Sequence, residues 1–126
     1  MSDIVQRWVQ QALYDFQTAR AMQQTGRYLY VLFCCQQAVE KTLKGLIAKN
    51  TGEFPPRIHQ LVRLAEVAGL SLPSEHADFL RELSAYYIQT RYPEELADTA
   101  AEITAEIAGR VLESSEREIQ WLHSML

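Results

Sequence analysis

Apolar residues recur at intervals of three and four positions along most of the chain. No segment long enough for a strand alternates apolar and polar residues as a half-buried strand would. This period predicts five helices, over residues 2–25, 28–49, 59–68, 74–89 and 98–123. Ser2 and Ser74 are the expected N-caps, and Gly26 is the expected stop after the first helix. Because the connections are short, the sequence predicts an all-α protein, an antiparallel up-down helical bundle of four to five helices.

Two helices show clear core stripes. The first is expected to turn these residues inward: Val5, Trp8, Ala12, Ala19 and Met22. The last is expected to bury Ile103, Ile107, Val111 and Ile119, and to expose Glu102, Glu106 and Arg110. The loop around Pro55 and Pro56 is the longest predicted connection, and Arg91-Tyr92-Pro93 is expected to break the fourth helix.

Several polar residues fall inside the apolar arcs. On the second helix, Gln36 and Glu40 lie among apolar positions, and on the first helix Asp15 lies within the core stripe. Buried amides and carboxylates need partners. We therefore predict a buried polar cluster of Asp15, Gln36 and Glu40. We expect Asp15 to pair with Arg91, Lys41 or Lys44, the alternative being a position at a gap or dimer seam in contact with water.

Length and composition limit the classes of protein. The chain has 126 residues, so we expect a single domain over residues 1–126. No apolar run reaches the roughly 18 residues that a membrane span needs, and no signal peptide is apparent, so we expect a soluble, cytoplasmic protein. The net charge of −4 disfavours nonspecific duplex binding, although Lys41, Lys44 and Arg91 can still form a local basic patch.

Four segments of the chain resemble a known family, the HEPN domain, named for higher eukaryote and prokaryote nucleotide binding. The matching residues are Trp8, Ala12, Asp15 and Ala19, then the run from Phe33 to Lys44, then His59 with Leu61, and finally Tyr87 with Arg91-Tyr92-Pro93. The resemblance implies an antiparallel helical bundle that often dimerises. It also implies a frequent partner, a minimal nucleotidyltransferase, in a complex or a toxin–antitoxin pair.

The family's ribonuclease members carry an arginine followed, after four to six residues, by a histidine. Here the corresponding positions after Arg91 hold Leu96, Ala97 and Asp98, so the catalytic histidine is missing. In metal-independent RNA cleavage, imidazole can act as the base for the 2′-hydroxyl or as the acid for the leaving 5′-oxygen, because it titrates near neutrality. His59 is the candidate to replace the missing catalytic histidine, provided that the fold brings His59 near Arg91.

Other chemistry finds little support in the sequence. Cys34 and Cys35 are adjacent on a helix with no further cysteine, so they are expected to be small core residues. No histidine has a second ligand at helical metal-site spacing, and no glycine-rich phosphate loop occurs. We therefore expect no metal site and no cofactor.

Three functions remain open. The first, which we favour, is a homodimeric binding module that docks a nucleotidyltransferase and holds nucleotide or RNA, with these candidate residues: Lys41, Lys44, Arg91, Tyr87 and Tyr92. The second is a weak metal-independent endoribonuclease acting through Arg91 and His59. The third is a purely structural interaction subunit, in which Arg91-Tyr92-Pro93 is only a turn. Expected dimer contacts are the flank of the second helix and the chain end with Trp121, Leu122, Met125 and Leu126.

Overall fold

The computed structural model describes residues 2–88 and 91–126, and in these residues it contains six α-helices and no strand. They are α1 (Asp3–Gln24), α2 (Tyr28–Thr51), α3 (Leu61–Val67), α4 (Ser74–Ser84), α5 (Pro93–Glu102) and α6 (Ala105–His123). The predicted all-α helical bundle is confirmed, with more helices than the four to five expected.

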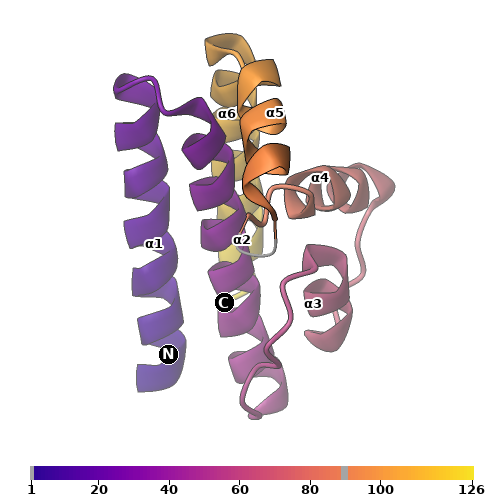
Figure 1. Cartoon of the computed structure of the whole chain (residues 1–126). Helices are drawn as coiled ribbons and strands as arrows, with labels where there is room; N and C mark the ends of the chain where they lie inside the picture. Colours follow the sequence, from indigo (N-terminus) through magenta and orange to yellow (C-terminus); the bar gives the residue numbers. More distant parts are fainter. Residues whose placement is uncertain (1, 89–90) are drawn as a thin grey trace.

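The central helix is α2. It runs antiparallel to α1 and packs most extensively against α1 and α6, while α3 and α4 lie together on one side (Figure 1). The residues of α2 that face these neighbours are almost completely buried, including Val31, Leu32, Val39, Leu43 and Leu46. At Gly45 the backbone comes close to Trp8, whose Cβ lies 3.4 Å from where a Cβ at Gly45 would be. A Cβ at this crossing would therefore already lie in contact with α1.

The first two helices begin and end close to the predicted positions. Ser2 caps α1, because its hydroxyl accepts a hydrogen bond from the backbone N–H of Val5 at 3.3 Å. Gly26 has a φ of 77°, in the left-handed region that favours glycine, and it allows the tight turn into α2. In the predicted core stripe of α1, Val5, Ala12 and Ala19 are buried, whereas Trp8 and Met22 are half-buried.

The second half of the chain corrects several predicted boundaries. Helix α3 begins at Leu61, so His59 precedes it, and Ser74 is the first residue of α4 while Pro73 occupies the cap position. Helix α4 ends at Ser84, and the predicted end at Gln89 lies outside the described residues.

The single long helix predicted over residues 98–123 is wrong, because α5 and α6 are separate. Ile103 is extended, and the hydroxyl of Thr104 caps α6 by accepting a hydrogen bond from the Ile107 N–H at 3.2 Å. Val111 is buried as expected, and Ile103 and Ile119 are partly buried against the core. Ile107 is only half-buried, although it shares α6 with Val111 and Ile119.

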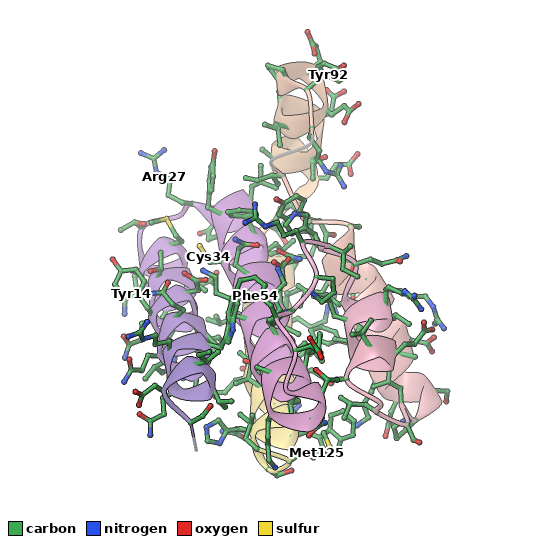
Figure 2. The ribbon with its side chains drawn as sticks, turned by 90° about the horizontal axis from the view of Figure 1, so that it is seen from below. Tyr14, Arg27, Cys34, Phe54, Tyr92 and Met125 are labelled. Atoms are coloured by element: carbon green, nitrogen blue, oxygen red, sulfur yellow. The ribbon has the colours of Figure 1, made fainter. Side chains whose placement is uncertain are left out.

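Helix α5 differs from the other helices in burying none of its residues. Pro93, expected only as a breaker, occupies the first turn of this helix, where proline is well tolerated. Tyr92 immediately precedes α5, with 71% of its surface exposed, and lies at the edge of the molecule in Figure 2. The helix therefore offers its surface to the surroundings.

Candidate functional site

The site is built around Glu40, in the middle of α2. This carboxylate is nearly fully buried, and it accepts hydrogen bonds from Gln36 Nε2 at 3.0 Å and from Lys44 Nζ at 3.0 Å. All three residues lie one helical turn apart on the same face of α2, which is why their side chains meet. The predicted burial of Gln36 and Glu40 is confirmed, and the carboxylate charge is balanced locally by an ammonium group.

His59 joins this network from the loop before α3. Its Nδ1 lies 3.1 Å and 3.2 Å from the two oxygens of Glu40, and its backbone carbonyl accepts a hydrogen bond from Gln36. A carboxylate at Nδ1 favours the tautomer that carries its proton there. The other ring nitrogen, Nε2, is then the acceptor of the neutral imidazole.

An aromatic stack holds the other side of the histidine. The rings of His59 and Tyr87 lie 3.9 Å apart at an angle of 13°, and Tyr87 also meets Phe33 of α2 at 6.2 Å. Burial raises the pKa of the Tyr87 hydroxyl, and the negative charge of Glu40 raises it further. The His59 ring is therefore fixed both in its plane and at its Nδ1 edge.

These groups border an open hollow of about 700 Å³, hereafter the His59–Arg91 hollow. It is lined by His59, Gln60, Arg81, Ser84, Ala85, Tyr87, Arg91 and Glu95. Ser84, one of these lining residues, joins the start of α3 to the end of α4. Its hydroxyl accepts a hydrogen bond from the Leu61 N–H at 2.9 Å. The hollow thus collects residues from two loops and two helices.

Two arginines supply the positive charge of the hollow. Arg91 donates a hydrogen bond to the backbone carbonyl of Ala85, which holds its guanidinium near the end of α4. Arg81 bonds Asp78 one turn earlier on α4, at 2.8 Å, and both of these side chains are well exposed. Since an exposed ion pair is worth little, Arg81 can exchange Asp78 for another anion at low cost.

The predicted lysines lie elsewhere. Lys41 donates to Asp15 across α1 and α2 at 2.5 Å, so the predicted pairing of Asp15 with a cation is confirmed for Lys41. Lys44 is buried beside Glu40 and lies 5.8 Å from the Trp8 ring. Neither lysine lines the hollow, and their contact with a nucleotide stays a prediction. Asp15 belongs to its own ion pair rather than to the group of Gln36 and Glu40.

The sequence brought His59, Tyr87 and Arg91 forward as candidates, and the structure places all three at one hollow. Tyr92 does not line this hollow and is well exposed just before the first turn of α5. Sequence reasoning missed Arg81 and Glu95, which lie on exposed helical faces and look like ordinary solvated charges. The i, i+4 spacing of Glu40 and Lys44 was a signal for their pairing that the helical projection alone did not reveal.

A second histidine–glutamate pair, which the sequence did not suggest, joins α4 to α6. Nδ1 of His76 lies 2.6 Å and 2.9 Å from the oxygens of Glu118, and its ring stacks on Trp121 at 3.9 Å. Burial raises the pKa of Glu118, although the hydrogen bond and charge of His76 act in the opposite direction. This pair fastens two helices together.

The remaining chemistry is limited. Burial raises the pKa of the Cys34 thiol to about 11 and that of Cys35 to about 12, so neither thiol is a ready nucleophile. Within residues 2–88 and 91–126, no group of three or more histidine, cysteine or acidic side chains is arranged to hold a metal ion. The same part of the chain contains no helix that is long and apolar enough to cross a membrane.

Comparisons with known proteins agree with this architecture. The sequence model of the HEPN domain matches residues 5–125. The solved structure of TT1696 from Thermus thermophilus is similar over 99% of this chain and 100% of that one, with 25% identity and a TM-score of 0.84. The structure of ST0689, described as an archaeal HEPN homologue, matches over 98% of both chains with 23% identity and a TM-score of 0.76. No curated protein sequence matches significantly.

Proposed function

This chain belongs to the HEPN domain family, and from that premise we propose that it is a homodimeric binding module which acts beside a minimal nucleotidyltransferase and holds nucleotide or RNA. The ligand site is the His59–Arg91 hollow. The partner and the toxin–antitoxin setting follow from the family resemblance, while the ligand class follows from the chemistry of the hollow.

One observation carries the ligand proposal: two arginines and a stacked histidine–tyrosine pair line the same hollow. Guanidinium groups bind phosphate through paired hydrogen bonds, and aromatic rings provide a surface on which a base stacks. Arg81 and Arg91 would hold phosphate, and the His59–Tyr87 pair would provide the ring surface that meets the base. A nucleotide is the ligand that presents both groups together.

The partner proposal draws support from α5. This helix buries no residue and carries four acidic side chains, Glu94, Glu95, Asp98 and Glu102, with no basic residue. A ten-residue helix is marginally stable alone, so contact with another protein would stabilise it. Glu94, Asp98 and Glu102 recur every four residues on one face of α5 and do not line the hollow, and this acidic face favours a basic protein surface.

The ligand proposal is tested by titrating the protein with 5′-AMP and with a short single-stranded RNA, using calorimetry. We expect both to bind, and Arg91→Ala to weaken binding roughly tenfold, as loss of a charged hydrogen bond predicts. Arg63→Ala is the matched control, because Arg63 is an exposed arginine whose partner is Glu66 and which does not line the hollow. Equal affinities for the two variants would contradict the proposal.

The partner proposal has a separate test. Tagged protein is purified from its native cell at low salt, and the bound proteins are identified by mass. We expect a nucleotidyltransferase subunit together with a dimer of this chain, and we expect reversal of the α5 charges by Glu94→Lys and Asp98→Lys to release it. Recovery of a dimer alone, or a partner unaffected by these changes, would contradict a role for α5.

A second candidate function, a weak metal-independent endoribonuclease, is favoured by the position of His59. Its Nδ1 faces Glu40, which leaves Nε2 as a base, and Arg91 lines the same hollow. Nε2 would take the proton of a ribose 2′-hydroxyl as its oxygen attacks the adjacent phosphorus. The bond to the 5′-oxygen would break, that oxygen would take a proton from water, and Arg91 would stabilise the charged intermediate.

This activity predicts RNA cleavage in the presence of EDTA, giving 2′,3′-cyclic phosphate and 5′-hydroxyl ends. His59→Ala and Arg91→Ala should each abolish cleavage, while His123→Ala, at the exposed end of α6, should retain it. Persistence of cleavage in the His59→Ala protein would assign the activity to a contaminant.

A further inference from the structure

Glu95 is the residue of the His59–Arg91 hollow that the proposed function leaves unexplained. It lies in the first turn of α5 and lines the hollow together with Arg81 and Arg91. Within residues 2–88 and 91–126 it makes no ion pair or hydrogen bond through its side chain. A carboxylate without a partner therefore stands at the edge of a cationic site.

This carboxylate opposes the binding of a bare anion. A phosphate monoester carries a charge of about −1.5 to −2 near neutral pH, which the two arginines balance. A further negative charge beside them weakens the attraction. Glu95 accepts hydrogen bonds and donates none when ionised. A ligand overcomes the repulsion if it presents hydroxyl donors to Glu95 while its phosphate meets the arginines.

The usual structural role of an acidic residue in the first turn of a helix does not by itself explain Glu95. An acidic side chain in the first turn of a helix interacts favourably with the helix dipole. Glu94 occupies the same turn of α5 and supplies that interaction, yet it does not line the hollow. The position of Glu95 at the hollow is thus additional to what the helix needs.

We propose that Glu95 selects ribonucleotides, by accepting a hydrogen bond from a ribose hydroxyl while Arg81 and Arg91 hold the phosphate. Acidic side chains recognise ribose in this way at other nucleotide sites, where they bond the 2′-hydroxyl. The inference rests on the proposed function, and it specifies the sugar of the ligand. The 2′-hydroxyl is the group that separates ribonucleotides from deoxyribonucleotides.

The test compares 5′-AMP with 2′-deoxy-5′-AMP, which differ only in that hydroxyl, by calorimetric titration at one salt concentration. Wild-type protein should bind 5′-AMP roughly tenfold more tightly, as a hydrogen bond to a charged group predicts. Glu95→Ala should remove this preference by weakening 5′-AMP binding, with 2′-deoxy-5′-AMP changed little. Glu106→Ala is the control and should behave as the wild type, because Glu106 is an exposed glutamate in the first turn of α6 that does not line the hollow.

The outcomes separate the two proposals. If both nucleotides bind the wild type equally, or if Glu95→Ala strengthens both alike, Glu95 only repels phosphate and the ribose proposal is overturned while the binding proposal stands. If neither nucleotide binds at millimolar concentration, both proposals fail. Glu95 is exposed, and circular dichroism of each variant will establish that the helical content is retained.

Discussion

Two regions of the molecule use the same three kinds of side chain in different surroundings. In each, a histidine turns Nδ1 to a glutamate that is 5% exposed and stacks its ring on an aromatic residue at 3.9 Å. One is the set of His59, Glu40 and Tyr87, and the other is the set of His76, Glu118 and Trp121. The His59 side chain is 39% exposed and that of His76 is 20% exposed.

The surrounding charges distinguish them. Glu40 also accepts a hydrogen bond from Lys44, so its charge is balanced without the histidine. Within the described residues, the imidazole of His76 is the only side-chain partner of Glu118, and burial raises the pKa of Glu118. The histidine beside Glu40 is therefore free to serve a ligand, whereas His76 is needed to compensate a buried carboxylate. A histidine–glutamate pair alone does not mark a functional site.

The largest effect is expected from removing the carboxylate of the first set. Glu40→Ala leaves the ammonium of Lys44 buried without its counter-charge, and we expect a loss of about 3–5 kcal/mol in the free energy of unfolding. Urea denaturation measures it. Glu66→Ala is the control, because Glu66 is exposed and should change stability by less than about 0.5 kcal/mol. Similar losses in both variants would mean that Glu40 is not the centre of a buried network.

The two histidines provide the direct contrast. His76→Ala leaves Glu118 without its partner and should cost roughly 2 kcal/mol, the range for a lost hydrogen bond to a charged group. His59→Ala should cost less than about 1 kcal/mol, because Lys44 and Gln36 still bond Glu40. Urea denaturation of the two variants measures both losses. A larger loss for His59→Ala than for His76→Ala would contradict the contrast drawn between the two sets.

The pH dependence of stability should come from the second set. The pKa of Glu118 is raised in the folded protein, so the folded state holds this proton more tightly than the unfolded state does. The stability that protonated Glu118 gives the folded state is fully present below about pH 4.3, the ordinary pKa of glutamate. It is lost as pH rises through the raised pKa of the folded state.

Glu118→Gln should remove this loss, so the variant should gain stability relative to the wild type as pH rises from 4 to 7. Thermal unfolding across that range measures the difference, and Glu113→Gln, an exposed glutamate on the same helix, should leave the profile unchanged. A constant difference between Glu118→Gln and the wild type would show that Glu118 does not titrate differently on folding.

The smallest effect is expected at the second contact between α4 and α6. Arg110 bonds Glu82 at 2.8 Å, and this bond raises the pKa of Arg110, but the two side chains are 53% and 38% exposed. Arg110→Ala should therefore cost less than about 1 kcal/mol. A loss as large as that of His76→Ala would mean that exposed and buried pairs contribute equally to holding these helices together.

Much of the fold was predictable because helical periodicity depends only on residues three and four positions apart in the sequence. The spacing of apolar residues predicted α1 and α2 to within two residues and placed Gln36 and Glu40 in buried positions. The single helix predicted over residues 98–123 failed because no proline or glycine marks its break. Thr104 was a readable N-cap signal in retrospect, since its hydroxyl is three residues before the N–H of Ile107.

The sequence alone determined most of the buried positions of α1 and α2, and it showed that a buried carboxylate or amide would need a partner. Only the tertiary structure decided which partners from other elements each received. His59 reaches Glu40 across 19 positions and His76 reaches Glu118 across 42, distances at which periodicity carries no information. Burial follows from local spacing, but pairing depends on how loops and helix crossings bring distant side chains together. That arrangement also brought Arg81, Arg91 and Glu95 to one hollow.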